Sequence, residues 1–495
     1  MHKYLFLLVF MLCGSLLQAA QVRLSMLLIP SKTQADSLWR AIQNKEPFAD
    51  LALRFSRGAA WESGGDLGFL PEEDLDPEIR RLSLELQPGQ VSKPTRTESG
   101  YLLLYVRDRK EASDYAIYQE ALRKWRLWGD SLQVLVNKDN FEEARLLGGR
   151  NLAHAREAFG RSSEEAASSL GDLGVIHYYA GNYQTARTFY TDALQILQAR
   201  LGPRHPELVP VLNNLAELYF REGDYDAALL AYDRILAILR LRSEEGDISD
   251  LPYLVARLNV LQEAGRFEEG ELQAQEIDYL RLRYFQRTEE NWATLLIELG
   301  EFYAAAHQDG KASDAFQAAL AARKRFLGAE HLLVARLLNK MGLFDQDNGR
   351  LQVAEKEFKE ALGIFTRNLG EVDPAAAAVN NNLGELYRAQ GRYSEAELFL
   401  LKALASRESN LGATDPAVAE TLNNLGLVYD ALGRNEDAME NFRRAASILE
   451  ERQPNSENKL LRTIYMNSLN LYSRLQRPEQ VEELKNKLRG LNNEG

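Results

Sequence analysis

Apolar residues after position 110 recur with the period of an α-helix. In residues 212–219, for example, Leu212, Leu215, Ala216 and Tyr219 are spaced three and four apart, which places them on one stripe of a helix. Glycines separate these stretches, and glycine ends helices because it takes the left-handed conformation without a Cβ penalty. The sequence from residue 111 onward therefore predicts an almost wholly helical region.

The helical stretches repeat with a fixed period. A Leu-Gly pair comes 21 residues before a turn glycine in several copies, as in Leu201-Gly202 before Gly223. Two helices per repeat fit this spacing, and a fixed period of this length is typical of stacked helix pairs. In most copies an aromatic or large apolar residue follows the turn glycine after two positions and an alanine after five. The turn glycines stand 42 residues apart within two runs, which are Gly181, Gly223 and Gly265, then Gly349, Gly391 and Gly433.

Two sequence strings identify the kind of repeat. Residues 201–206 read Leu-Gly-Pro-Arg-His-Pro and residues 212–219 read Leu-Asn-Asn-Leu-Ala-Glu-Leu-Tyr, and both return with small changes at 411–416 and 422–429. This pattern resembles tetratricopeptide repeats of the kinesin-light-chain type. The resemblance covers residues 139–490, and it implies an all-α superhelix of about seven to eight repeats with a concave groove for peptides.

Paired asparagines recur beside the buried stripe, at 213–214, 381–382 and 423–424. An amide side chain both donates and accepts hydrogen bonds, which suits the backbone of an extended peptide. On this interpretation Asn214, Asn382 and Asn424 are the candidates for contact with a peptide in the groove. The alternative is an amide ladder that bonds helix to helix within the stack, and the sequence leaves both open.

Residues 21–110 have a different sequence pattern, in which short apolar runs alternate with glycine and proline turns. They predict a small α/β domain. The expected strands cover 22–29, 64–70 and 101–106, and the expected helices cover 34–43, 48–55 and 77–86.

Four phrases in this segment carry a second resemblance. They are Pro-Phe-Ala-Asp-Leu-Ala at 47–52, Gly-Gly-Asp-Leu-Gly-Phe-Leu at 64–70, Pro-Gly-Gln-Val-Ser-Lys-Pro at 88–94 and Ser-Gly-Tyr-Leu-Leu-Leu-Tyr-Val at 99–106. In this order they resemble the parvulin type of peptidyl-prolyl cis-trans isomerase, or rotamase. The resemblance implies a parvulin-like domain over residues 21–110, followed by a helical linker at 111–138.

The departures from the parvulin pattern fall at its active site. Residues 21–110 contain no histidine, and the resemblance places the two family histidines at Met26 and Leu102. The family's Cys or Asp position corresponds to Gly58. Leu75 and Ile79 match places that line the proline-ring pocket, and Met26 and Leu102 would add to its floor. The alternative is that these four apolar residues are simply core, and no catalytic residue is assigned.

Loss of the histidines does not by itself decide the activity. Prolyl isomerisation is a rotation about a conjugated amide with a barrier of roughly 18–20 kcal/mol, and it breaks no covalent bond. An apolar pocket lowers the barrier by holding the twisted imide better than the planar one. Without a polar group that orients the substrate, we expect weak or no isomerase activity.

The charge of the chain narrows the class of partner. Lys and Arg total 59 against 72 Asp and Glu, and residues 21–110 hold 13 of each sign, so the excess acidity lies in the helical part. Nucleic acid is an unfavourable partner for such a chain because phosphate binding depends on clustered Lys and Arg. One cysteine and six histidines leave little material for metal chemistry, so we expect no metal and no cofactor.

The first twenty residues have the pattern of an export signal. Lys3 precedes an uncharged run over residues 4–17, and Gln-Ala-Ala follows at 18–20. We expect a signal peptide at 1–20 and an exported protein, periplasmic or secreted. An uncleaved anchor, or a lipoprotein signal at Cys13, are the alternatives.

Two functions agree with these features. The first is an exported folding factor or chaperone that binds proline-containing or unfolded polypeptide, with weak or no isomerase activity. The second is a non-catalytic scaffold for assembly of an exported complex. Both predict protein or peptide clients, no nucleic acid, and no membrane association beyond the export signal.

Overall fold

The computed structural model describes residues 20–58, 60–241, 248–285, 290–452 and 459–493. It divides into two compact units, the first ending at Leu280 and the second beginning at Arg281. The predicted signal peptide, with Cys13, lies outside the described residues apart from Ala20. In the part of the chain that is described, no helix combines the length and the apolar character that a membrane span requires.

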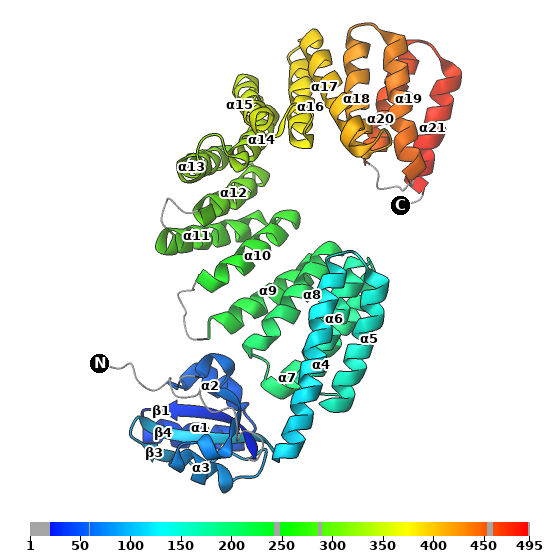
Figure 1. Cartoon of the computed structure of the whole chain (residues 1–495). Helices are drawn as coiled ribbons and strands as arrows, with labels where there is room; N and C mark the ends of the chain where they lie inside the picture. Colours follow the sequence, from blue (N-terminus) through cyan, green and yellow to red (C-terminus); the bar gives the residue numbers. More distant parts are fainter. Residues whose placement is uncertain (1–19, 59, 242–247, 286–289, 453–458, 494–495) are drawn as a thin grey trace. The chain divides into compact units, whose positions relative to one another are not determined.

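The first unit begins with a four-stranded antiparallel sheet (Figure 1). Its strands are β1 (Gln21–Ile29), β2 (Asp66–Pro71), β3 (Thr95–Thr97) and β4 (Gly100–Lys110), in the order β2-β1-β4-β3. Met26 pairs with Leu104 and Leu28 with Leu102 across β1 and β4. The apolar strands β1 and β4 are therefore central, and the shorter strands form the edges.

Helices cover both faces of this sheet. Alternate residues of a strand point to opposite faces, so Leu27 and Ile29 pack against α1 (Lys32–Gln43) and α2 (Phe48–Phe55). Val22 and Leu24 face the other side, where Leu82 of α3 (Pro77–Leu84) completes a second apolar cluster. Two short 3-10 turns, Trp61–Ser63 and Glu72–Asp74, flank β2.

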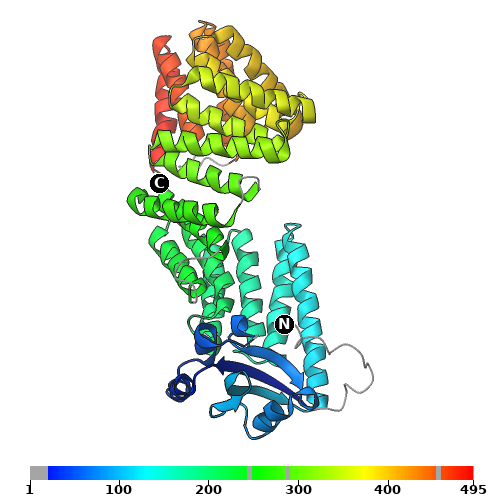
Figure 2. The same cartoon turned by 90° about the vertical axis from the view of Figure 1, so that its left-hand side faces the viewer.

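The rest of the first unit is helical. The stretch 111–138, expected to be a linker, contains α4, which packs on α5 and α6. Both views place the sheet beside one end of α4 (Figures 1 and 2). The helices are α4 (Ala112–Val136), α5 (Phe141–Ala158), α6 (Glu164–Tyr179), α7 (Tyr183–Leu201), α8 (Val209–Arg221), α9 (Tyr225–Leu239), α10 (Leu251–Glu263) and α11 (Phe267–Tyr284), of which the last four residues belong to the second unit.

The second unit continues the same alternation of helices. Together with the α/β sheet domain, this helical array confirms the predicted fold class. Its helices are α12 (Glu290–Ala305), α13 (Asp309–Leu327), α14 (Leu332–Asp347), α15 (Leu351–Leu369), α16 (Pro374–Ala389), α17 (Tyr393–Leu411), α18 (Pro416–Ala431), α19 (Asn435–Arg452), α20 (Lys459–Arg474) and α21 (Pro478–Asn493).

Glycines inside the first helix of a repeat allow close packing of the second. A Cβ built on Gly342 would lie 2.5 Å from the ring of Phe358, and one on Gly426 would lie 2.6 Å from the ring of Phe442. In each pair the ring stands 16 residues after the glycine. The large buried ring therefore occupies the space that a side chain would need, which explains why the repeat carries glycine there.

Candidate functional site

The four residues predicted to form a prolyl pocket lie in one apolar cluster. Met26, Leu75, Ile79 and Leu102 all belong to the cluster between the sheet and α3. Leu102 is buried, with 2% of its surface exposed, whereas the other three are partly buried. The fold thus brings them together from two strands, a turn and a helix, and their role as a prolyl pocket stays a prediction.

Gly58 borders this cluster. A Cβ built on it would lie 3.8 Å from the Cε of Met26 and 3.6 Å from the Cβ of Leu28. Ser56 fixes this loop against β1, because its hydroxyl accepts hydrogen bonds from the backbone N–H groups of Leu28 at 3.2 Å and Gly58 at 3.1 Å. A polar side chain at position 58 would therefore stand beside the side chain of Met26.

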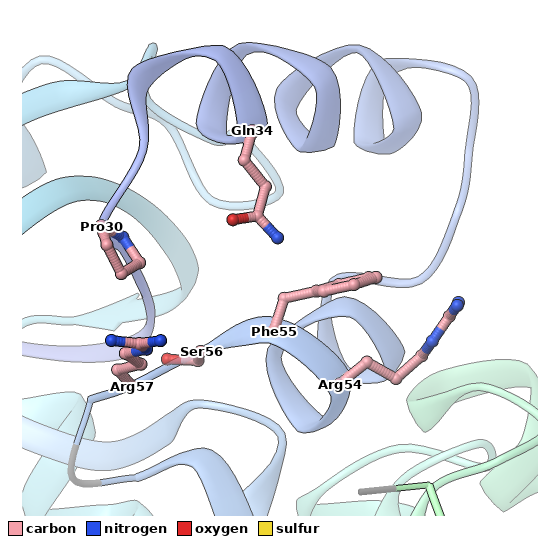
Figure 3. A pocket seen from close by; sticks show the side chains of 6 residues that line it. All are labelled: Pro30, Gln34, Arg54, Phe55, Ser56 and Arg57. Atoms are coloured by element: carbon pink, nitrogen blue, oxygen red, sulfur yellow. The ribbon is translucent and has the colours of Figure 1, made fainter.

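A hollow of about 400 Å³ is lined by residues from α1, from the end of α2 and from the segments next to them (Figure 3). The Arg54 guanidinium stands 4.8 Å from the centre of the Phe55 ring. None of the four predicted pocket residues lines this hollow. Its lining residues are Pro30, Gln34, Arg54, Phe55, Ser56 and Arg57.

The described residues do not form a metal site. Nowhere in the described ranges do three or more His, Cys, Asp or Glu side chains gather in a way that would hold an ion. The cluster between the sheet and α3 consists of apolar side chains, so it can offer burial and shape but no charge.

A partly buried polar network ties the sheet to the helices of the first unit. Arg23 donates to Asp66 through Nε at 3.0 Å and Nη2 at 2.6 Å, and Nη2 also donates to Glu164 of α6 at 3.1 Å. Arg107 lies 3.7 Å from the same Asp66 carboxylate. Burial lowers the pKa of Arg23, but the hydrogen bond to Asp66 and the charge of Glu164 outweigh it and raise the pKa. The guanidinium therefore stays charged within the contact.

The loop between α7 and α8 makes a second contact with the sheet domain. Gly202 has a φ of 98°, and a Cβ on it would lie 2.8 Å from the Oδ1 of Asp50 and 3.0 Å from the Cβ of Pro47. His205 is 4% exposed; its Nδ1 accepts from the Glu207 N–H at 3.2 Å, and its ring also bonds to the Ser63 backbone. The string at 201–206 is therefore also a docking loop, a role that its sequence did not reveal.

This docking loop predicts a pH effect. Burial lowers the pKa of His205 below its ordinary value, although the hydrogen bond to Ser63 opposes this. The unfolded chain then binds a proton more readily, so the contact is fully stable above about pH 6.5 and weakens as the pH falls below that value. We expect hydrogen exchange at residues 63–65, corrected for the intrinsic rate, to quicken between pH 7.5 and pH 5.

An asparagine substitution supplies the control, because Asn can cap a helix but does not titrate in this range. His205→Asn should abolish the pH effect. His331 makes the same capping bond to the Leu333 N–H at 3.2 Å but is exposed, so His331→Asn should leave exchange at residues 63–65 unchanged. An unaltered pH effect in His205→Asn would contradict this assignment.

Four of the six paired asparagines bond to an asparagine on a neighbouring helix. Asn382 donates to Asn339 at 2.9 Å, Asn424 to Asn381 at 3.3 Å, and Asn467 to Asn423 at 2.9 Å. These bonds join α14 to α16, α16 to α18, and α18 to α20. This is the ladder arrangement, and contact of Asn382 and Asn424 with a peptide stays a prediction.

The ladder gives a stability prediction. Asn424→Ala leaves the buried Asn381 amide without its partner, which should cost about 1–3 kcal/mol, and Asn382→Ala should have a similar effect. Asn214 makes no side-chain hydrogen bond with the described residues, so Asn214→Ala should cost much less. Thermal melts of the three single variants test this, and equal melting shifts would contradict it.

Comparison with known proteins supports both resemblances. The model of the PPIC-type PPIASE domain matches residues 30–108. The model of the tetratricopeptide repeat matches residues 133–199, 165–240, 333–409 and 376–451.

Relatives with established names are similar to parts of the chain. "Chaperone SurA" of Pseudomonas savastanoi pv. phaseolicola is 34% identical over 132 residues, covering 25% of this chain and 31% of that protein. "Foldase protein PrsA" of Bacillus subtilis is 32% identical over 85 residues, covering 17% of this chain and 29% of that protein. The crystal structure of BtubC from P. vanneervenii is 22% identical with a TM-score of 0.39, covering 49% of this chain and 90% of that one.

The chain spans less than a third of the length of these two named relatives. Its own two regions are nevertheless each matched by a family model, in the order that the sequence predicted. The chain therefore consists of a PPIC-type rotamase domain of the parvulin type followed by tetratricopeptide repeats.

Proposed function

We propose that this protein is an exported folding factor or chaperone that binds proline-containing or unfolded polypeptide. The observation that carries the proposal is the apolar cluster of Met26, Leu75, Ile79 and Leu102 within a rotamase domain. Such a cluster suits a proline ring, which gains by leaving water. The names of the relatives, a chaperone and a foldase, agree with this class of function.

We also propose that catalysis is weak or absent. Met26 and Leu102 stand where the parvulin resemblance expects histidines, and the thioether and isobutyl groups offer no strong hydrogen bond to a substrate carbonyl. Loss of one oriented donor costs about two to three decades of rate in other enzymes. Binding of a proline segment does not need such a donor, because it depends on apolar contact.

Absence of histidine from residues 21–110 also favours a second candidate. In that case the domain does not catalyse isomerisation, and the whole chain is a non-catalytic scaffold for assembly of an exported complex. The contacts of Arg23 and of the buried His205 hold the domain to the repeats. A scaffold would use this connection to present two surfaces together.

The test uses residues 21–495 in two assays, prolyl isomerisation with several residues before Pro and suppression of aggregation of an unfolded client. A folding factor should suppress aggregation, and Ile79→Asp should weaken that suppression because it charges the cluster. Leu84 lies on the same helix but is 53% exposed, so Leu84→Asp is the matched control. A parent without effect in either assay would leave the scaffold as the function.

Restoring the histidines should raise turnover. Met26→His with Leu102→His returns the two polar groups to the positions that the family pattern assigns, and we expect the isomerisation rate to rise about tenfold or more. Because Leu102 is buried, the folded state of the double variant must be checked by its amide NMR spectrum. A folded double variant with no gain in rate would show that the cluster no longer places an imide beside these positions.

A further inference from the structure

The amide ladder of the second unit is interrupted in the first. Bonded amides stand 43 or 44 residues apart on consecutive first helices of the repeats. Asn213 and Asn214 of α8 occupy the same repeat positions as Asn381 and Asn382. Their ladder partners would be residue 171 on α6 and residue 256 on α10, but these are glycine and alanine. The two α8 amides therefore lack the partners that the same amides have elsewhere.

The missing partner leaves open space on α6. A Cβ built on Gly171 meets no heavy atom within 4 Å. Asn213 and Asn214 are half-buried, and neither bonds through its side chain to any residue in the described ranges. A half-buried amide without a partner is unfavourable, because it has lost part of its water and gained no bond in return. A ligand that supplied both a donor and an acceptor would satisfy this pair.

Asp172 lies next to Gly171 and occupies the repeat position of Asn214. It is partly buried and forms no ion pair with the described residues, and burial raises its pKa to about 6. The next charged residues along α8 are already engaged, because Glu217 accepts a hydrogen bond from the Tyr178 hydroxyl at 3.1 Å and Arg221 donates one to the same hydroxyl at 3.1 Å. The Asp172 carboxylate therefore has no cationic partner among the described residues.

We propose that Gly171, Asp172, Asn213 and Asn214, here called the α6–α8 amide face, bind an extended polypeptide segment that carries a lysine or arginine. Asn214 donates to a backbone carbonyl of the segment, Asn213 accepts from a backbone N–H, and Asp172 accepts from the cationic side chain. Amides complement a peptide backbone of any sequence, and the carboxylate adds selection by charge. The inference deepens the proposed function, because it rests on the binding of polypeptide clients.

Peptide titrations test the charge selection. The probe is an unstructured, fluorescently labelled peptide of twelve residues in three versions that differ at two positions, with Lys, Gln or Glu. We expect the Lys version to bind tightest by fluorescence anisotropy. Asp172→Asn should weaken the Lys version about tenfold, as loss of a hydrogen bond to a charged group does, and should change the Gln version less than twofold.

An exposed aspartate gives the control for net charge. Asp192 of α7 is exposed, so Asp192→Asn changes the total charge equally but lies on the second helix of its repeat. Its Kd for the Lys version should equal that of the parent. Equal effects of Asp172→Asn and Asp192→Asn, or no effect of either, would overturn the proposal.

Completing the ladder tests the amides. Gly171→Asn would give Asn214 the partner that Asn382 has in Asn339, so it should weaken all three peptides, whereas Gly171→Ala controls for helix propensity. Asn424→Ala in the second unit should lower the melting temperature without changing peptide binding. Unchanged binding in Gly171→Asn would contradict the amide contacts.

Aggregation suppression, measured on the same variants, separates this inference from the function on which it rests. If the parent and Gly171→Asn suppress aggregation equally, the folding-factor function stands and the α6–α8 amide face is not its client site. If the parent neither suppresses aggregation nor catalyses isomerisation, the proposed function falls. The peptide titrations then still decide whether the α6–α8 amide face binds a cationic segment.

Discussion

Asp66→Ala should loosen the rotamase domain by about 1–3 kcal/mol, the range expected when a partly buried charged group loses its hydrogen-bond partner. Its carboxylate, 14% exposed, accepts two bonds from Arg23, faces Arg107 and accepts the Gly68 N–H at 2.9 Å. The substitution leaves two arginines with little water around them. Hydrogen exchange of β1 and β2 in the whole chain measures the loss.

Glu164→Ala is the matched comparison. It removes a single bond to Arg23 and leaves the Asp66 pair intact, so its effect on β1 should be about 1 kcal/mol. The double variant should cost less than the sum of the two, because both act on Arg23. Additive effects, or an effect of Asp66→Ala below that of Glu164→Ala, would show that the network does not depend on Asp66.

Glu357→Gln should stabilise the second unit at alkaline pH. Glu357 of α15 is 9% exposed and lies against Asp345 of α14, which is 6% exposed and pairs with Arg350. Burial, with the charge of Asp345 and a hydrogen bond to it, raises the pKa of Glu357 to about 8. The folded protein therefore holds a proton there that the unfolded chain releases near pH 4.5.

The direction of this pH dependence follows from the proton that Glu357 keeps in the folded state and loses on unfolding. Between about pH 4.5 and 8 the unfolding free energy of the parent falls as the pH rises, by an amount on the order of a few kcal/mol. Gln keeps a donor toward Asp345 without a charge, so calorimetry should show equal melting temperatures near pH 4.5 and a higher one for Glu357→Gln at pH 9. Glu360→Gln, on the partly exposed side of α15, should show no such divergence.

Most elements of the rotamase domain could be predicted from local sequence, but the three-residue edge strand β3 was missed. The apolar run expected at 22–29 is β1, the helix expected at 48–55 is α2, and the run expected at 101–106 lies within β4. Each signal is local, because an apolar run between turn residues favours a buried strand and a 3.6-residue period favours a helix. The 42-residue spacing likewise predicted the helix pairs, because each repeat carries its own turn glycine.

Contacts between distant residues could not be predicted in this way. Arg23 and Glu164 are 141 positions apart, and nothing in either local pattern marks the other as its partner. An arginine within the apolar run of β1 was a signal that a buried acid must lie nearby, but it did not say which. The choice between groove and ladder for Asn382 likewise depended on the residue one repeat earlier, Asn339, outside the recurring pairs.

The turn glycine of the docking loop has an evolutionary consequence. Gly202, Gly328, Gly370 and Gly412 close the same turn in different repeats, and a side chain would meet no neighbour at the last three, whereas Asp50 and Pro47 fill the space at Gly202. A duplication or loss of repeats after α8 leaves the contact of the docking loop with Asp50 and Pro47 intact. An insertion between β4 and Gly202 moves the docking loop away from Asp50. Lineages that share this architecture should therefore differ in repeat number on the carboxyl side of Gly202 and keep a constant number before it.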